Sequence, residues 1–216
     1  MINKNICKVL LVLIFFILSP LTCFSADIIF GIENKGPGGN MKKGEELIIT
    51  GDSYANRFIE CCMRKQFFKV SYKYSKEGRT TSENYNLMAQ AMASDISDTV
   101  MVCVSVNDYA KSTYPIFKTN MEYLTIIGLE HNKKIIFHTY MDYIIDDKTY
   151  NDFTIADYDK VLRDLAEMYE NVYYIDMTGF DKNIYLVEDG LHYDFRFYDV
   201  LYNKFLNLVE KIRSDM

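Results

Sequence analysis

The sequence has no tryptophan, and among its 216 residues it has only three prolines and three histidines. The absence of tryptophan argues against a dedicated sugar-binding platform, because such platforms stack sugar rings on large aromatic faces. The sequence also has no basic cluster, and its net charge is −6, so it does not indicate a nucleic-acid-binding protein. The scarcity of histidine leaves few candidates for a general base.

Three of the five cysteines lie beyond the first 25 residues, and these three match neither a disulfide framework nor the spacing of a metal site. Cys61 and Cys62 are adjacent in a segment with a helical pattern, and Cys103 lies in an apolar segment typical of a strand. No histidine lies near them in the sequence, which disfavours a catalytic cysteine. We interpret these three residues as buried free thiols.

The first 25 residues have the pattern of a secretory signal peptide. Lys4 and Lys8 form a short basic region, residues 9–18 are uninterrupted apolar residues, and Cys23 and Ser25 are small residues before the expected cleavage site. The apolar run is short for a membrane span, which needs about 20 residues. The protein is therefore expected to be secreted or extracytoplasmic, with no stable membrane insertion after cleavage. An uncleaved N-terminal anchor is the alternative.

Two further regions follow the signal peptide. Residues 26–45 contain Gly36-Pro37-Gly38-Gly39 and are predicted to be a lead-in segment, and residues 46–216 are long enough for one domain with a sizeable core. Strands are predicted at 47–50, 68–74, 99–106, 134–140 and 172–176, and helices at 54–66, 82–94, 115–130, 155–169 and 195–213, with Ser82 as a helix cap. This alternation predicts a parallel sheet of the α/β class, with helices on both faces.

Ser53 follows Gly51 and Asp52 at the point where the first predicted strand ends and a helix begins. A serine at such a turn exposes its hydroxyl and has its backbone N–H at the positive end of the helix dipole. This position suits a nucleophile, although Gly-Asp-Ser alone is also typical of an ordinary turn.

A serine nucleophile needs a base to take its proton, and His192 is the best candidate. His131 is predicted at the opposite end of the sheet, whereas His138 lies late in a strand, nearer the edge with Ser53. His192 comes three residues after Asp189, whose carboxylate can reach back to the imidazole Nδ1–H and fix its tautomer.

Donors for a developing oxyanion are also predicted at this edge of the sheet. The backbone N–H of Ser53 is one, Gly78 offers a second N–H without a side chain in the way, and Asn107 offers a side-chain amide. Taken singly, Gly78 is an ordinary loop glycine and Asn107 an ordinary helix cap. Their order and shared placement predict a site for acyl transfer.

Four other residues have two interpretations each. His138 and Tyr140 approach the same edge and either line the substrate pocket or pack in the core. Arg57 and Arg79 either recognise an anionic substrate or are solvated surface residues.

The sequence resembles the SGNH hydrolases, also called GDSL-type esterases and lipases. The matching blocks are Gly51-Asp52-Ser53, Gly78, Val106-Asn107-Asp108 and Asp189-Gly190-Leu191-His192. The resemblance implies a flavodoxin-like three-layer α/β/α sandwich with about five parallel strands, and it makes residues 46–216 an SGNH hydrolase-like domain. It also implies Ser53 as nucleophile, His192 as base and Asp189 as its orienting acid, with an oxyanion hole formed by Ser53, Gly78 and Asn107.

Three positions depart from the pattern of that family. Ser105 stands where a glycine usually precedes the asparagine by two residues, Tyr193 stands where proline commonly follows the histidine, and Tyr54 replaces a leucine-like residue after the serine. The match is therefore to the broad superfamily and not to one subfamily.

The leading hypothesis is an exported serine esterase that hydrolyses carboxylic esters, with O-acetyl groups on carbohydrate among the candidate substrates. It needs no metal or organic cofactor, its partner is a small-molecule or polysaccharide ester, and the sequence does not specify an oligomeric state. The alternatives are an O-acyltransferase with a sugar acceptor and a non-catalytic surface glycan-binding module. A flavodoxin-like cofactor-binding protein is disfavoured, because no glycine-rich phosphate loop follows the first strand.

Overall fold

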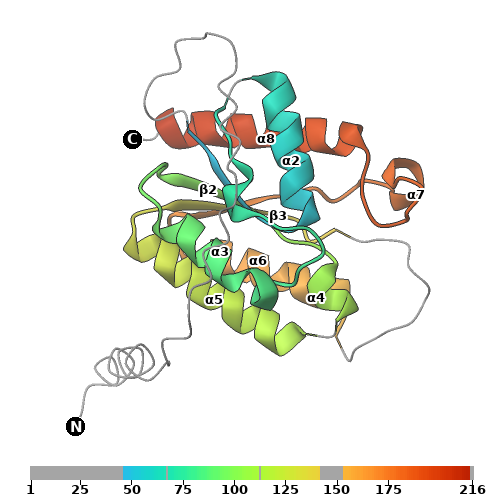
Figure 1. Ribbon diagram of the computed structural model, residues 1–216, viewed down its shortest axis with the longest axis horizontal. Helices are drawn as coiled ribbons and strands as arrows, with labels where there is room; N and C mark the ends of the chain where they lie inside the picture. The colour runs from blue at the N-terminus through green and yellow to red at the C-terminus, as the bar shows by residue number, and fades with distance from the viewer. Residues whose placement is uncertain (1–45, 67, 112, 142–152, 215–216) are drawn as a thin grey trace. The chain divides into compact units, whose positions relative to one another are not determined.

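The computed structural model describes residues 46–66, 68–111, 113–141 and 153–214. The predicted signal peptide (1–25) and lead-in segment (26–45) lie outside the described residues. Within the predicted domain a parallel sheet is covered by helices on both faces, as Figure 1 shows. The predicted three-layer α/β/α fold is therefore confirmed.

The sheet has four described strands in the order β1-β2-β3-β4, all parallel. They are β1 (Ile48–Gly51), β2 (Thr99–Cys103), β3 (Lys134–His138) and β4 (Val172–Ile175). The central residues of β1, β2 and β3 are buried because helices cover both faces, which explains why these segments are apolar rather than alternating, whereas the two central residues of β4 are partly exposed. Four of the five predicted strands are thus confirmed, and those at 99–106 and 134–140 end earlier than predicted.

The predicted strand at 68–74 is wrong. That segment has two isolated parallel bridges to the first strand and its flank, Glu46↔Lys69 and Gly51↔Ser75, and the 3-10 turn η1 (Tyr72–Tyr74). Between the bridges the Ser71 hydroxyl accepts a hydrogen bond from the Lys73 N–H at 3.2 Å. This local bond competes with a strand ladder, so the segment runs beside β1 without forming a fifth strand.

In the described part of the chain five long helices cover the sheet, and all five were predicted. Figure 1 shows α2 (Ser53–Lys65) and α8 (Phe195–Ser214) on one face, and α3 (Thr81–Ala93), α5 (Tyr114–Glu130) and α6 (Ile155–Met168) on the other. Each face has its own cluster of buried apolar side chains. The short helices α4 (Asn107–Ala110) and α7 (Lys182–Tyr185) were not predicted. Within the described ranges, no helix combines the length and the apolar character needed to span a membrane.

The N-terminus of α3 is capped by Thr80, so the predicted cap, Ser82, is wrong. The Thr80 hydroxyl accepts from the Glu83 N–H at 3.2 Å, and the Glu83 carboxylate accepts from the Thr80 N–H at 2.8 Å. This reciprocal capping box requires a glutamate three residues after the cap, a spacing that Thr80 has. The box fixes where α3 begins, directly after the loop that carries Gly78.

Candidate active site

Gly51 closes β1 and allows the chain to turn into α2. Its φ is +137°, and a Cβ atom at this position would lie 1.9 Å from the Cys103 carbonyl oxygen on the neighbouring strand. Only glycine fits both the conformation and the close approach. The first residue of the Gly-Asp-Ser motif is therefore required by the meeting of β1 and β2.

Asp52 joins the loops that follow β1 and β2. Its carboxylate accepts from the Tyr54 N–H at 2.9 Å, which caps α2, and from the Ser105 N–H at 2.9 Å and the Ser105 hydroxyl at 2.7 Å. The Asn107 side-chain amide donates to the same carboxylate at 3.0 Å. Burial raises the pKa of Asp52, and these four hydrogen bonds oppose that rise by favouring the charged form. Sequence reasoning assigned Asp52 no such role.

Ser53, His192 and Asp189 form one hydrogen-bonded chain. The distance from Ser53 Oγ to His192 Nε2 is 2.8 Å, and His192 Nδ1 lies 2.7 Å from Asp189 Oδ2. Ser53 is only 6% exposed, less than the sequence predicts for a serine on an open turn, because the imidazole lies against its hydroxyl. The structure thus brings together the three residues predicted as nucleophile, base and orienting acid, although they come from the two ends of the domain.

The Asp189 carboxylate is held in its charged form. Burial alone would raise its pKa, but hydrogen bonds from the His192 ring and from the backbone N–H groups of His192 and Leu191 outweigh it, so the pKa of Asp189 is lowered. A charged Asp189 favours the imidazole tautomer with its proton on Nδ1. Nε2 is then free to accept the proton of the Ser53 hydroxyl, as a general base must.

The three predicted oxyanion donors differ in how their hydrogen-bonding groups are arranged in the structure. The Ser53 N–H lies in the first turn of α2, where helix N–H groups have no intrahelical partner. Asn107 gives one amide proton to Asp52, and because the amide carries two, the second remains available to a ligand.

Gly78 lies on an exposed turn with a φ of +66°. The bonds that tie its loop to the site include those from the Lys76 N–H to the Gly51 carbonyl at 3.2 Å, from the Asn56 amide to Glu77 at 3.2 Å and from the Asn84 amide to the Lys76 carbonyl at 3.1 Å. No hydrogen bond among the described residues joins Gly78 to Ser53 or to Asn107.

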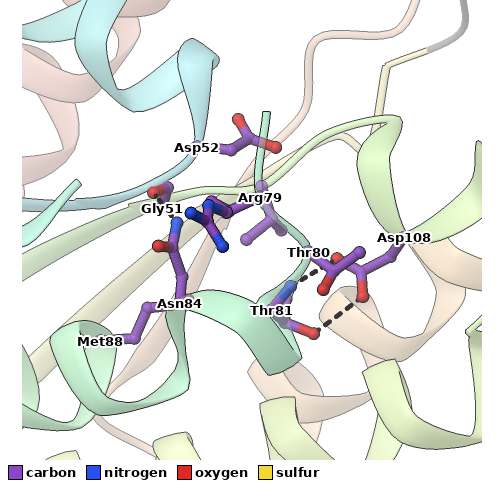
Figure 2. Close-up of a pocket in the computed structure, with 9 residues that line it drawn as sticks. Gly51, Asp52, Arg79, Thr80, Thr81, Asn84, Met88 and Asp108 are labelled. Carbon is purple, nitrogen blue, oxygen red and sulfur yellow. Dashed lines mark hydrogen bonds between the residues drawn. The ribbon is translucent and has the colours of Figure 1, made fainter. Parts of the chain in front are cut away.

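A second group of buried polar residues supports the site from the α3 side. Figure 2 shows Gly51, Asn84 and Asp108 around a small hollow next to Asp52. The Asn84 amide donates to the Gly51 carbonyl at 2.8 Å, and Asp108 accepts from the Thr81 N–H at 2.8 Å and the Thr81 hydroxyl at 2.9 Å. Burial raises the pKa of Asp108 to about 6. The bonds to Asp108 fasten the start of α3 to α4, which begins at Asn107, and the bond from Asn84 fastens α3 to the end of β1. No sequence pattern marks Asn84.

For the four residues that had two interpretations in the sequence, the structure places two in the core and two on the surface. His138 and Tyr140 are each 1% exposed and pack in the core. Arg57 is on the surface, 3.6 Å from Glu60. Arg79 is exposed but lines the hollow in Figure 2. Within the described part of the chain, no group of three or more histidine, cysteine or acidic side chains is arranged to hold a metal ion.

Comparison with known proteins gives structural matches only. No family model and no curated protein matches the sequence. A GDSL-like lipase from Bacteroides thetaiotaomicron has a TM-score of 0.64 at 13% identity, covering 80% of this chain and 91% of that one. An acetylxylan esterase from Geobacillus stearothermophilus has a TM-score of 0.53 at 18% identity, covering 77% and 95%. The C-terminal catalytic domain of a Streptococcus pneumoniae peptidoglycan O-acetyltransferase has a TM-score of 0.57 at 16% identity, covering 80% and 97%.

These matches show that the chain has the fold of GDSL-type lipases and esterases. At such low identity the fold is what the comparison establishes.

Proposed function

We propose that this protein is an exported serine esterase of the SGNH type, which hydrolyses carboxylic esters with Ser53 as nucleophile. The observation that carries the proposal is the hydrogen-bonded chain from Ser53 through His192 to Asp189, with distances of 2.8 and 2.7 Å. A serine hydroxyl becomes an effective nucleophile only when a base is within this reach and is itself oriented by a third group.

In the proposed reaction the Ser53 oxygen attacks the ester carbonyl carbon while His192 Nε2 takes the hydroxyl proton. The charge that develops on the carbonyl oxygen is stabilised by the Ser53 N–H, the Gly78 N–H and the second amide proton of Asn107. The imidazolium, stabilised by Asp189, then gives its proton to the leaving alcohol. The alcohol leaves, and the acyl group remains bonded to Ser53 Oγ. Water then attacks the acyl carbon while His192 takes one of its protons, the bond to Ser53 Oγ breaks as His192 returns that proton to Ser53, and the acyl group leaves as a carboxylic acid.

The proposed substrates are O-acyl groups on a polar alcohol, with O-acetylated carbohydrate as the first class to test. The similarity to an acetylxylan esterase supports this class. The proposed location of the protein outside the cytoplasm rests on the N-terminal segment, in which a basic region, an apolar run and small residues follow one another as in a signal peptide.

An O-acyltransferase is the second candidate, because the chain is also similar to the catalytic domain of a peptidoglycan O-acetyltransferase. The two reactions share the acyl-enzyme and differ in whether water or a sugar hydroxyl accepts the acyl group. Product analysis with an acetyl donor, with and without a sugar acceptor, separates them. Hydrolysis predicts free acetate in both, whereas transfer predicts acetylated sugar.

The test of the esterase is the hydrolysis of p-nitrophenyl acetate and butyrate by the purified protein. Ser53→Ala and His192→Ala are expected to lower kcat by at least about a thousandfold. Ser82→Ala and His131→Ala are matched controls, since both residues are exposed and outside the site, and they should leave kcat unchanged. Hydrolysis by the wild type that persists in Ser53→Ala would overturn the proposal. No turnover and no reaction of Ser53 with a fluorophosphonate would favour a non-catalytic glycan-binding module.

A further inference from the structure

Tyr54, the residue directly after the proposed nucleophile, is hydrogen-bonded to the loop that carries the proposed base. Its side chain is 1% exposed, and its hydroxyl donates to the Leu191 carbonyl oxygen at 2.9 Å. Leu191 lies between Asp189 and His192 in the sequence. The start of α2 and the Asp189–His192 segment are therefore joined by a bond that is separate from the contact between Ser53 and His192.

The segment with His192 is the end of a hairpin whose own hydrogen bonds fix its shape. These bonds are Val187 N–H to His192 O at 2.8 Å, Gly190 N–H to Val187 O at 2.9 Å, Asp194 N–H to Tyr185 O at 2.7 Å, and the antiparallel bridge Leu186↔Tyr193. All of them lie within the hairpin, so they do not determine its distance from α2. The tip is also only partly covered, since the Asp189 side chain is 47% exposed.

The Tyr54 ring has little freedom to move. Its centroid is 6.1 Å from that of His192 and 6.4 Å from that of His138, on which it stacks with an interplanar angle of 16°. The rings of Tyr193 and Phe197 approach it edge-on at 6.3 and 6.4 Å. A ring enclosed in this way keeps its hydroxyl in one place. Burial also raises the pKa of Tyr54 well above its ordinary value, so the hydroxyl remains a donor throughout the working pH range.

We propose that Tyr54 is a positioning residue, which holds His192 at hydrogen-bonding distance from Ser53 by binding the Leu191 carbonyl. The inference rests on the proposed function, because an effect on rate requires Ser53 and His192 to be nucleophile and base. It gives a physical reason for the departure from the family pattern at this position. A leucine-like side chain has no donor for the Leu191 carbonyl, whereas tyrosine adds one without leaving the core.

Tyr54→Phe removes the hydroxyl and keeps the ring. The loss of one buried neutral hydrogen bond is expected to lower kcat for p-nitrophenyl acetate about three- to tenfold, while KM changes less than about twofold. The rate of Ser53 labelling by a fluorophosphonate should fall by the same factor, because it depends on the same base.

Tyr74→Phe is the matched control. Tyr74 is 4% exposed, and its hydroxyl donates to Ser94 at 3.1 Å, away from the hairpin. The Tyr74→Phe variant loses a hydroxyl of comparable burial. Its free energy of unfolding should therefore change, while kcat and the rate of Ser53 labelling remain at the wild-type values. Equal losses of kcat in both variants would mean that Tyr54 acts only through general stability, and would overturn the inference.

An isosteric pair at position 54 separates donation from packing and serves if Tyr54→Phe does not fold. Replacement of Tyr54 by 4-aminophenylalanine keeps a donor at the end of the ring, whereas 4-methylphenylalanine fills the same space without one. The amino variant is expected to retain the wild-type kcat to within about twofold and the methyl variant to lose it as Tyr54→Phe does. Equal activities of the two would contradict the inference.

A spectroscopic readout keeps the inference distinct from the proposed function. The Nδ1 proton between His192 and Asp189, at a separation of 2.7 Å, should give a low-field proton NMR signal in the wild type. In Tyr54→Phe we expect this signal to broaden or disappear, and in Tyr74→Phe to remain. If the wild type hydrolyses no ester, the proposed function fails, and the signal alone then tests the positioning. An unchanged signal in Tyr54→Phe overturns the inference whether or not the protein is active.

Discussion

His138 should make the stability of the protein depend on pH in a window set by its burial. The ring lies at the end of β3, is 1% exposed, and has Nδ1 2.7 Å from the Thr139 carbonyl oxygen. Its Nε2 atom is buried and has no hydrogen-bond partner among the described residues. The neutral ring with its proton on Nδ1 fits this environment, whereas a proton on Nε2 would have no acceptor. Burial accordingly lowers the pKa of His138 to about 4, although the Thr139 carbonyl and Asp159 favour the charged form.

The sign and size of the effect follow from this depressed pKa. The unfolded chain takes up a proton at His138 below about pH 6.5, whereas the folded protein does so only near pH 4, so stability is lost as the pH falls through this window. At about 1.4 kcal/mol per pH unit the full window amounts to about 3 kcal/mol. Asp108 acts in the opposite direction, because its raised pKa of about 6 means that the folded state takes up its proton first. The pH curve of the wild type alone therefore does not isolate His138.

The contribution of His138 is isolated by the difference in free energy of unfolding between the wild type and His138→Gln, measured as a function of pH. Urea unfolding at pH 7.5, 6.5, 5.5 and 4.5 is best followed by circular dichroism, since the chain has no tryptophan. His138→Gln is expected to be destabilised at pH 7.5, and this deficit should shrink by about 2 to 3 kcal/mol at pH 4.5. His131→Gln replaces an exposed histidine and should run parallel to the wild type. Parallel curves for wild type and His138→Gln would mean that His138 does not titrate with a lowered pKa in the folded protein.

Three further predictions concern the site and its support. Asn107→Ala removes one proposed oxyanion donor and should lower kcat for p-nitrophenyl acetate about a hundredfold or more with little change in KM; an unchanged kcat would exclude it from the oxyanion hole. Asp189→Asn should lower kcat by about a hundredfold to ten-thousandfold, since the His192 tautomer is no longer fixed, and a wild-type rate would contradict its orienting role. Thr80→Ala breaks the capping box with Glu83 and should lower the free energy of unfolding by about 0.5 to 2 kcal/mol in urea, with Ser82→Ala as the neutral comparison.

The parts of the site that could be predicted from the sequence are those set by local geometry. Ser53 is marked by a strand-to-helix turn, and Asp189 and His192 are marked by a spacing of three residues in one loop. The structure places His192 within hydrogen-bonding distance of both Ser53 and Asp189. The order of the four strands and the five long helices of the described residues could also be predicted, because continuous apolar segments and amphipathic helices alternate along the chain.

The remaining features depend on contacts between distant segments. Asp52 is recognisable as the residue that joins two loops only when Ser105, 53 positions later, and Asn107, 55 positions later, are seen to donate to it. The hydrogen bond from Tyr54 to Leu191 spans 137 positions. No spacing rule covers such pairs, since they arise from the folding of the sheet and not from any local pattern.

The predicted strand at 68–74 failed for a different reason. Its alternation of polar and apolar residues is typical of a strand, but at the edge of the sheet only β1 is available as a partner. The Ser71 hydroxyl and the Lys73 N–H then form a local bond, which competes with the ladder. Periodicity reports which face of a segment is buried, and it does not report whether the backbone is paired.

Whether Ser53 is the nucleophile is decided by mapping the residue that a fluorophosphonate modifies, by mass spectrometry of peptides from the labelled protein. We expect one adduct, on the peptide that contains Ser53, which forms at least about a hundredfold more slowly in His192→Ala and at the wild-type rate in His131→Ala. An adduct on another serine, or equal labelling of Ser53 in wild type and His192→Ala, would contradict this expectation.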